Sequence, residues 1–493
     1  MSVENSTRLA RGKTVWRFAS HRSPKAESLP TAPGDFKKKL SAVSFHGNLF
    51  VLMHQVNLGM IGGGTVGSGV FHALQQNGDL MAARLGVQIV FRKIAVKAFD
   101  EPRPYPIPRT LMTTDWQKVV NDPQIQILIE LVGGTGIAKT MVLAALAQGK
   151  TVVTANKALV STHGPELFAA AAKGGANLYY EASVCGGIPI IKSLREGFVA
   201  NQFAAIYGIV NGTCNYILTR MKLEGADFAD VLTDAQKLGY AETPPDLDID
   251  GHDAQHKTGI LASLAHGFWV DHDKIHTEGI RDVSKIDMQF AQQLGYTIKL
   301  LGIVKQSKAQ SLKSKVRGGV QVSVYPTLIP NAHVLASVNG VFNACFVRGD
   351  VVGDTLFYGR GAGKDATASA VLSDVADAAL DLKHGGKVRI PPFVAYAQSG
   401  GVVPMDEITS RYYVRLSVVD RPGVLAKISA IFAASKIGIS SVIQPEGHEG
   451  ESVPLILMLH DAPNAAMRKA LAKIAKLPVI KGRPVMFRVE NLD

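Results

Sequence analysis

The segment from Ala235 to Lys257 concentrates ionisable side chains that could do chemistry. Five acidic residues precede its single late lysine, namely Glu242, Asp246, Asp248, Asp250 and Asp253. An apolar-periodic stretch follows, so a helix should begin near Gly251, with Asp253 in its first turn, where the helix dipole favours a carboxylate. Asp253 and Lys257 are four residues apart and therefore project from the same face. The pair is either a surface salt bridge or a carboxylate and a lysine placed to transfer a proton.

A glycine-rich loop begins at Gly62 and reads GGGTVG, which fits the G-x-G-x-x-G pattern. It follows an apolar run and opens a helical stretch, and that context is typical of dinucleotide binding. Gly62 would make the tight turn, Gly64 would let the backbone approach a pyrophosphate, and Gly67 would allow close helix packing. Amides of the first helical turn, at Thr65 and Val66, would hold the phosphates. The alternative is a glycine-rich turn in another α/β protein.

The choice between NAD and NADP depends on the end of the second strand of such a fold. An acidic side chain there binds the ribose 2′-hydroxyl, and a basic one suits a 2′-phosphate. This chain has Lys97 at that place, with Arg92 and Lys93 nearby, and Asp100 comes later. We therefore predict NADP as the cofactor and keep NAD as the alternative.

Two further loops should face the same edge of the sheet. Thr135 follows two glycines after an apolar run, and Lys157 follows the run that ends at Thr154. In an open parallel sheet these positions border the cofactor crevice. Lys157 could then reach both cofactor and substrate, although a surface lysine in a loop is the alternative.

These motifs need elements that bring them together. We expect short strands at Val56–Ile61, Gln88–Val96, Ile125–Leu131 and Thr151–Thr154, alternating with helices at Val66–Gln76 and Ala138–Gln148. That alternation indicates βαβ units and a parallel sheet. From about residue 183 helical stretches surround extended ones, which indicates a separate α+β part. Its expected helices include Ile188–Gly197, Asn215–Leu223, Phe228–Leu238 and Ala254–Gly267, and its expected strands include Ala204–Val210 and Gly319–Tyr325.

Composition and charge exclude several classes of protein. The 493 residues have the composition of ordinary globular domains, without an apolar run long enough for a membrane span. Three scattered cysteines argue against a disulfide framework or a zinc site and fit a reducing, cytoplasmic setting. The net charge is +12, of which residues 1–52 contribute +6 from nine Lys/Arg and three Asp/Glu. We interpret this tail as a disordered extension, with a transit peptide as the alternative, and expect no nucleic-acid partner.

Taken together, these stretches resemble the homoserine dehydrogenase family from about Val56 to Leu382. The acidic segment keeps the family spacing, and further matching stretches are TANK ending at Lys157, EASVCGGIP starting at Glu181, NGT at Asn211 and GAG ending at Gly363. The resemblance implies an NAD(P)-dependent oxidoreductase that reversibly reduces aspartate β-semialdehyde to homoserine in threonine, methionine and isoleucine biosynthesis.

The resemblance also implies roles for individual residues. Lys257 would give a proton to the aldehyde oxygen, with Asp253 and Lys157 beside it in the catalytic group. Glu242, Asp248 and Asp253 would surround the substrate, and Gly363 would return the chain to the cofactor. Glu181 and the carbonyls of Val184, Gly186 and Ile188 would form a monovalent cation site, usually for sodium. Hydride addition leaves negative charge on the carbonyl oxygen, which needs a positioned acid, and carboxylates can hold an ammonium group.

The C-terminal segment resembles an ACT domain, with DRPGVL at Asp420–Leu425 as its strand-to-helix turn. That resemblance implies a ferredoxin-like fold that binds threonine between paired copies, in a homodimer or homotetramer. A structural appendage that binds nothing is the alternative. A Gly/Pro-containing stretch at 400–404 should let this part fold as a unit.

The expected organisation is therefore an α/β fold in several parts. Residues 1–52 form the extension, 53–182 a Rossmann domain completed by about 355–395, 183–354 a catalytic and dimerisation domain, 396–410 a linker and 411–493 the ACT domain. Two other functions stay open at this point. One is a non-catalytic Rossmann–ACT amino-acid sensor, and the other is a semialdehyde dehydrogenase that uses Cys185 or Cys214 as a nucleophile.

Overall fold

The computed structural model describes residues 54–307, 319–386, 388–397, 400–445 and 451–492. The basic extension predicted over residues 1–52 lies outside these ranges. Among the described residues, no helix is both long and apolar enough to cross a membrane.

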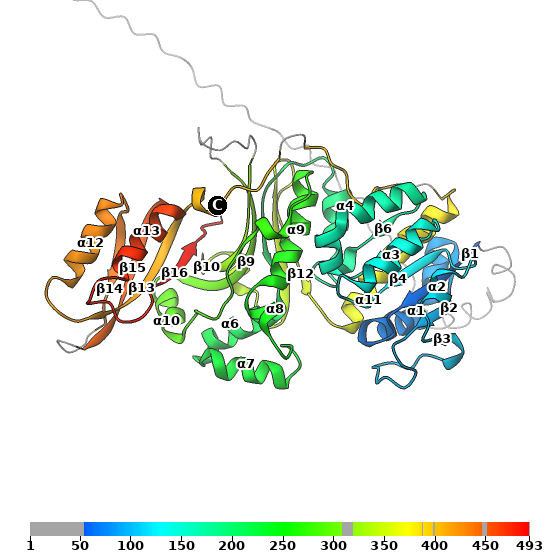
Figure 1. Cartoon of the computed structure of the whole chain (residues 1–493), viewed down its shortest axis with the longest axis horizontal. Helices are drawn as coiled ribbons and strands as arrows, with labels where there is room; N and C mark the ends of the chain where they lie inside the picture. Colours follow the sequence, from blue (N-terminus) through cyan, green and yellow to red (C-terminus); the bar gives the residue numbers. More distant parts are fainter. Residues whose placement is uncertain (1–53, 308–318, 387, 398–399, 446–450, 493) are drawn as a thin grey trace, which may run out of the picture. The chain divides into compact units, whose positions relative to one another are not determined.

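The first part of the chain forms a parallel six-stranded sheet with the order β3-β2-β1-β4-β5-β6 (Figure 1). Its strands are β1 (His54–Ile61), β2 (Val87–Ala95), β3 (Met112–Thr113), β4 (Ile127–Glu130), β5 (Thr151–Thr154) and β6 (Leu178–Tyr179). Every residue of β4 and β5 is buried, as in a sheet covered on both faces. This strand order is that of a doubly wound dinucleotide-binding fold, so the predicted α/β architecture is confirmed.

Helices connect these strands and cover the sheet. They are α1 (Thr65–Leu85), α2 (Gln117–Val120), α3 (Ile137–Ala147) and α4 (Lys157–Gly174), with a short 3₁₀ turn, η2 (Arg109–Leu111). Helix α1 runs nine residues beyond the predicted end at Gln76. It continues because Met81, Ala82 and Leu85 pack in the core, and it ends where Gly86 adopts a left-handed conformation.

The dinucleotide-binding part is completed by α11 (Lys364–Lys383), which packs against α1. We expected this return to begin near residue 355. In the structure β12 (Gly353–Arg360) instead pairs with β11 (Phe342–Gly349) in the second sheet. The alternating exposure of β12 fits an edge strand, and the return therefore begins at α11.

The second sheet is mostly antiparallel and begins with the order β12-β11-β7-β9-β10. Its further strands here are β7 (Phe203–Ile209), β9 (Tyr296–Gln306), β10 (Val320–Pro330) and β8 (His276–Thr277), which pairs with β10. Its helices are α5 (Ile190–Lys192), α6 (Gly212–Glu224), α7 (Phe228–Lys237), α8 (Asp246–Ile249), α9 (His252–His266) and α10 (Lys285–Gln293). Short helical turns are η3 (Glu181–Ser183), η4 (Ser193–Gly197), η5 (His272–Lys274) and η6 (Val334–Ser337). Helix α9 packs between strands β7, β9 and β10 and helix α4 of the first part.

The C-terminal segment has the order βαββαβ. Its elements are β13 (Thr409–Val419), α12 (Val424–Ala434), β14 (Ile439–Ile443), β15 (Ser452–Pro463), α13 (Asn464–Ile474) and β16 (Val485–Val489), preceded by η7 (Met405–Glu407). The strands pair as β16-β13-β15-β14, and Figure 1 draws α12 and α13 together beside them. This is a ferredoxin-like topology with a hydrophobic core of its own.

The sequence predicts a C-terminal part that folds as a unit after a linker. In the structure this segment is instead continuous with the second sheet. Strand β16 pairs with β10 through Thr327–Arg488 and Leu328–Val489, so the sheet runs on without a break. The expected linker is also tied down, because Val320 exchanges backbone hydrogen bonds with Gly401 and Val403. Apolar residues of β13, β15 and β16 belong to the same buried cluster as residues of α9, β9 and β10.

A buried ion pair reinforces this junction. Asp287 in the first turn of α10 is fully buried, and it accepts hydrogen bonds from the amide and hydroxyl of Ser284, the N-cap of the helix. The same carboxylate accepts two hydrogen bonds from Arg415 of β13, at 2.7 and 3.1 Å, and one from the Tyr413 hydroxyl at 2.9 Å. Removing it would leave a guanidinium without its partner at a mostly buried position.

Asp287→Ala should therefore lower the free energy of unfolding by about 3 kcal/mol, as expected when one partner of a buried ion pair is removed. Urea unfolding followed by circular dichroism measures this change. Asp282→Ala is the matched control, because Asp282 and its partner Arg483 are both mostly exposed, and it should leave stability nearly unchanged. Equal stabilities of the two variants would contradict the assignment.

Candidate active site

The predicted pair of Asp253 and Lys257 lies at the N-terminal end of α9. Gly251 begins the helix in a left-handed conformation, as a residue without a side chain readily does. Asp253 is 6% exposed and Lys257 8%, and Lys257 Nζ lies 2.7 Å from Asp253 Oδ2. The alternative of a surface salt bridge is therefore wrong. A buried ion pair demands further partners because both charges lose their water.

Lys157 supplies one of these partners from the other part of the fold. It is the first residue of α4, which Asn156 caps by accepting a hydrogen bond from the Leu159 amide at 3.1 Å. Lys157 Nζ lies 2.6 Å from Asp253 Oδ1. One carboxylate thus bridges two lysines, Lys157 at the start of α4 and Lys257 in α9.

The charges in this cluster shift the proton affinities of its members. Burial alone would raise the pKa of Asp253, but Lys257 and Lys157 outweigh burial and hold that pKa well below its usual range. Burial would lower the pKa of Lys157, but Asp253 reverses the effect and raises it. Asp253 is therefore ionised at neutral pH, and Lys157 is held in its charged form.

Asn211 connects the pair to the acidic loop. Its Nδ2 donates to Asp253 Oδ2 at 2.9 Å and to Asp248 Oδ1 at 2.8 Å, while its Oδ1 caps α6. Burial raises the pKa of Asp248. The preceding carbonyl, Val210 O, accepts a hydrogen bond from Lys257 Nζ at 2.8 Å. The sequence marks Asn211 only as part of a family motif, and its spacing does not predict this bridging position.

The acidic loop itself is held from outside by Arg281. Its guanidinium pairs with Asp250 at 2.5 Å and also with Asp246, on either side of Asp248. Glu242 is exposed at the start of the same loop, and its charge contributes to the raised pKa of both Lys157 and Asp248. The structure thus brings Glu242, Asp248, Asp253, Lys157 and Lys257 into one electrostatic neighbourhood.

The glycine loop has the geometry that a pyrophosphate needs. Gly62 has φ +105°, and a Cβ on it would lie 2.6 Å from Leu131 O, while a Cβ on Gly67 would lie 1.9 Å from Gly62 O. Nothing lies within 4 Å of the position of a Cβ on Gly64. That open space lies at the N-terminus of α1. The amides of the first turn, which starts with Thr65 and Val66, have no acceptor inside the helix.

A buried glutamate shapes the second loop of the crevice. Glu130, at the end of β4, accepts hydrogen bonds from the amides of Val132 and Gly133 and from the Thr154 hydroxyl, at 2.7, 3.2 and 2.7 Å. Asn156 Nδ2 adds a hydrogen bond to Gly134 O at 2.7 Å. These contacts fix the loop just before the predicted cofactor contact at Thr135. Glu130 was missed because a charged residue inside an apolar run gives no signal of its own.

The basic residues near the end of β2 divide into two groups. Arg92 and Lys93 both pair with Asp122, at 3.0 and 3.4 Å, so they are already engaged. Lys97 is exposed just beyond β2, and Asp100 pairs with Arg109. Of the three basic residues that suggested NADP, Lys97 is the one that makes no ion pair within the described part of the chain.

Glu181 is 3% exposed and binds the start of α5. Its two oxygens accept hydrogen bonds from the amides of Ile191 and Lys192, at 2.9 and 2.6 Å. Burial outweighs these hydrogen bonds and raises its pKa to about 7. The carbonyl of Ile188 accepts one hydrogen bond from the Ile190 amide. The loop after Glu181 lies against the loop that leads to Gly363, since a Cβ on Gly186 would lie 2.5 Å from Gly361 O.

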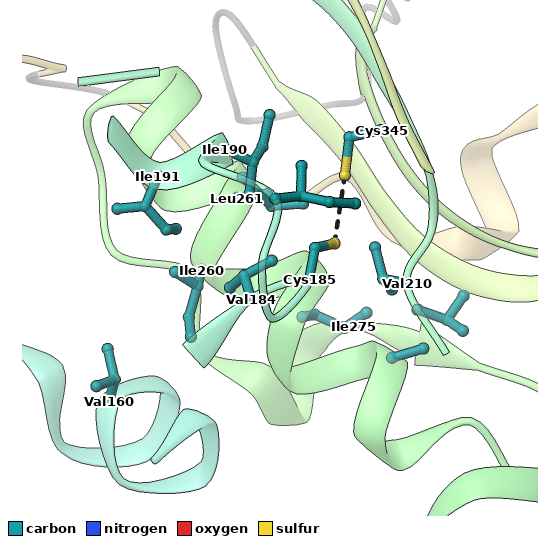
Figure 2. Close-up of a cluster of buried hydrophobic side chains, with 14 of the residues drawn as sticks. Val160, Val184, Cys185, Ile190, Ile191, Val210, Ile260, Leu261, Ile275 and Cys345 are labelled. Carbon is teal, nitrogen blue, oxygen red and sulfur yellow. Dashed lines mark hydrogen bonds between the residues drawn. The ribbon is translucent and has the colours of Figure 1, made fainter. Parts of the chain in front are cut away.

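The cysteines lie in the buried interior behind this loop. Cys185 and Cys345 have their sulfur atoms 3.5 Å apart, packed with Val184, Val210 and Leu261 (Figure 2). All three cysteines are fully buried, and burial raises the pKa of Cys214 well above its usual range. A nucleophilic cysteine needs an accessible thiolate, so this environment is unfavourable for a thioester mechanism.

Comparison with known proteins identifies the family. The family profile described as "Homoserine dehydrogenase, NAD binding domain" matches residues 62–181, and the profile "Homoserine dehydrogenase" matches residues 189–376. The homoserine dehydrogenase of Pseudomonas aeruginosa is 41% identical over 90% of this chain and 100% of its own length. The chain belongs to the homoserine dehydrogenase family. It is accordingly an oxidoreductase that acts on a CH–OH group with NAD(P), and neither alternative function is favoured.

Other relatives of the same family agree. The homoserine dehydrogenase of Bacillus subtilis is 35% identical over 89% of this chain and 99% of its own length. A crystal structure of a homoserine dehydrogenase from Thiobacillus denitrificans has a TM-score of 0.82 at 41% identity and covers 90% of this chain and 99% of its own. A hyperthermophilic archaeal homoserine dehydrogenase in complex with NADPH has a TM-score of 0.55 at 27% identity and covers 66% of this chain and 98% of its own.

Arg281→Ala should raise KM for homoserine about fivefold, because two partly exposed ion pairs that hold the acidic loop contribute about 1 kcal/mol. The value of kcat and KM for the cofactor should stay within about twofold, since the loop does not touch the glycine-rich turn. Steady-state kinetics at saturating cofactor measures both. Arg220→Ala is the matched control, because Arg220 makes similar ion pairs with Glu224 and Asp234 outside the acidic loop.

Proposed function

We propose that Lys257 is the acid that protonates the carbonyl oxygen when this homoserine dehydrogenase reduces aspartate β-semialdehyde to homoserine. One observation carries the proposal. An ammonium group has three N–H donors, and Lys257 directs two of them to Asp253 and the Val210 carbonyl. Within the described part of the chain the third donor has no protein partner, so it is available for a substrate oxygen.

The residues around Lys257 give this acid its orientation. Asp253 fixes the ammonium group through a charge-assisted hydrogen bond and is itself fixed by Lys157 and Asn211. NAD(P)H, when bound, supplies the hydride to the carbonyl carbon. The charge that develops on the oxygen is met by the Lys257 proton, and in the direction of oxidation Lys257 takes that proton back.

The remaining acidic residues suit the other end of the substrate. Homoserine and its aldehyde carry an ammonium group, and Glu242 and Asp248 supply carboxylates beside the lysine pair. We assign these two residues to that ammonium group. We assign Lys157, the first residue of α4, to contact both substrate and cofactor.

Lys257→Ala should lower kcat by roughly 10²–10⁴-fold, the usual contribution of a general acid. The Kd for NADPH should change little, because Lys257 lies on α9 and the glycine loop lies on the other sheet. Stopped-flow kinetics and fluorescence titration with NADPH measure these quantities. Lys173→Ala, which removes an exposed lysine late in α4, serves as the control, and near-normal kcat in Lys257→Ala would refute the role.

NADP is the cofactor that the end of β2 favours. Glycines that leave no room for a Cβ at 62 and 67 and open space at 64 fit a dinucleotide, and its phosphates would lie against the amides after Gly64. Lys97 would pair with the 2′-phosphate, since the residues that directly follow β2, at 96–98, include no acidic side chain. The related archaeal enzyme in complex with NADPH supports the same preference.

Lys97→Glu should shift the ratio of kcat/KM for NADPH to that for NADH towards NADH by about 10-fold or more, because a charge-assisted hydrogen bond becomes a repulsion. Parallel assays with the two cofactors measure the ratio. Lys93→Gln is the control, since Lys93 already pairs with Asp122. An unchanged ratio in Lys97→Glu would remove this residue from the cofactor site.

A monovalent cation, in particular sodium, is compatible with the loop after Glu181. Burial outweighs the nearby charges of Arg195 and Lys192 and raises the pKa of Glu181 to about 7, and a bound cation would stabilise its ionised form. Glu181 and the carbonyls of Val184, Gly186 and Ile188 would hold the ion. Bound there, it would fix the loop that touches Gly361, and so the return of the chain at Gly363.

The C-terminal ferredoxin-like segment is assigned as an ACT domain that binds threonine. The turn between β13 and α12 carries Asp420, whose side chain accepts a hydrogen bond from Gln444, and Gly423, which has φ +86° and open space at its Cβ. A homodimer or homotetramer would pair these turns. The exposed apolar residues Leu356 and Tyr358 on edge strand β12 also favour a second copy.

Threonine should change the activity of the full chain at millimolar concentration, with a coupling of about 1–3 kcal/mol between the two sites. Asp420→Ala should remove this response and keep the activity measured without threonine. Initial rates over a threonine series give the result. Asp461→Ala, an exposed carboxylate on β15, should respond like the unmodified chain, and a full response in Asp420→Ala would place the effector elsewhere.

A further inference from the structure

The loop that follows β2 lies beside the glycine-rich turn at both of its ends. This loop spans residues 96–108, and a Cβ on Gly63 would lie 2.6 Å from a methyl group of Val96 and 3.4 Å from one of Ile107. Val96 and Ile107 are buried, whereas every residue between them is at least partly exposed. The exposed part of the loop therefore starts and ends next to the turn that is proposed to bind the dinucleotide.

Arg103 ties this loop to itself. Its guanidinium donates hydrogen bonds to two consecutive carbonyls, to Phe99 O at 3.2 Å and to Ala98 O at 3.1 Å. The same side chain also reaches Met112 Sδ, in β3, at 3.3 Å. These three acceptors are neutral, so Arg103 serves here as a rigid fork of N–H donors that holds the backbone.

Tyr105 fixes the same loop to two helices. Its ring stacks on His72 of α1, with the ring centroids 3.9 Å apart and an angle of 9° between the planes. Its hydroxyl donates to Asp365 Oδ1 at 3.1 Å, and Lys364 Nζ lies 4.3 Å from the centre of its ring. Both of these partners lie in the first turn of α11. Stacking and the cation–π contact thus hold the loop against α1 and α11.

Lys97 lies in the exposed part of this loop, directly before the two residues whose carbonyls bind Arg103. Its neighbour Asp100 is already paired with Arg109. Within the described residues, Lys97 itself has no hydrogen-bond or ion-pair partner. A lysine on a backbone that is free to move loses conformational entropy when it binds a phosphate, and a backbone that is fixed beforehand reduces this loss.

We propose that Arg103 is a positioning residue for NADP, and that it sets the preference for the 2′-phosphate by holding the backbone that carries Lys97. The inference rests on the cofactor contact proposed above for Lys97. Arg103 directs both of its terminal nitrogens to the loop and to β3, so it acts through the conformation of the loop and not by touching the cofactor. NADH lacks the 2′-phosphate, so its binding does not depend on Arg103.

Arg103→Met tests this role, because it keeps the aliphatic stem and removes the donors. We expect kcat/KM for NADPH to fall about 5–10-fold, the usual effect of losing a hydrogen bond, and kcat/KM for NADH to change by less than about twofold. Initial rates with each cofactor at saturating aspartate β-semialdehyde measure both. Lys383→Met is the matched control, since the exposed Lys383 also donates to a backbone carbonyl, Leu85 O at 2.9 Å, at the other end of α1.

A double-mutant comparison separates positioning from direct contact. Lys97→Gln removes the charge that Arg103 is proposed to position. In that background Arg103→Met should change the ratio of the two kcat/KM values by less than about twofold, because two residues that act on one contact are not additive. Fully additive effects would overturn the proposal and place Arg103 on the phosphate. Parallel losses with NADPH and NADH would also overturn it, because they would indicate a purely structural role.

A second variant keeps the test decisive if Arg103→Met fails to fold. Tyr105→Leu keeps Arg103 but removes the stacked ring and its hydroxyl, so it should lower the preference for NADPH by about 2–5-fold. An unchanged ratio in Tyr105→Leu and in every folded Arg103 variant, together with a shifted ratio in Lys97→Glu, would overturn this inference alone. An unchanged ratio in Lys97→Glu would overturn the proposed cofactor contact and this inference with it.

Discussion

The shared carboxylate of Asp253 is the interaction on which the candidate site depends. It is buried, it forms an ion pair with Lys157 through Oδ1, and its Oδ2 accepts hydrogen bonds from Lys257 and Asn211. A buried carboxylate is unfavourable alone, and a buried ammonium group is equally so, because both lose their hydration. Asp253 and Lys257 are therefore tolerated at their buried positions because they are paired, whereas the Lys157 side chain is 44% exposed. Lys157 lies at the start of α4, which packs on the first sheet, and Asp253 lies in the first turn of α9, which packs on the second. Their ion pair therefore links these two helices.

That dependence extends outward through short contacts. Asn211 places Asp248 beside the pair, Arg281 holds the loop in which Asp248 lies, and Glu130 shapes the facing loop. Glu130 and Asn211 act at the ends of elements, where backbone amides are left without regular partners and donate to side-chain oxygens. The site is thus an assembly of element termini, and its residues come from positions as far apart in the sequence as 130 and 281.

Local patterns in the sequence were sufficient for much of this description. The glycines at 62, 64 and 67, the strand Thr151–Thr154 and the start of α9 at Gly251 each follow from a motif or a period of a few residues. The burial of Asp253 did not follow, because it depends on Lys157, nearly a hundred residues earlier. Asn211 and Glu130 gave no local signal, since an asparagine that caps a helix or a glutamate in a strand is ordinary in isolation. The pairing of β16 with β10 was missed for a similar reason, because a parallel neighbour more than 150 residues away leaves no trace in either strand.

The tight packing at Gly279 has a consequence for evolution and for engineering. A side chain there would lie 2.1 Å from the Ile249 carbonyl, and the preceding residue, Glu278, binds Arg488 of β16 with two hydrogen bonds at 2.8 and 3.0 Å. Residues 278 and 279 thus contact both the end of the acidic loop, at Ile249, and the last strand, β16. A chimaera that joined this catalytic region to a different C-terminal segment would have to carry an arginine in register with Glu278, or else tolerate a rearranged loop. Recombination at this junction would have to exchange Glu278 and Arg488 together. Strand β16 should therefore evolve with the region that contains Glu278, and not with helices α12 and α13.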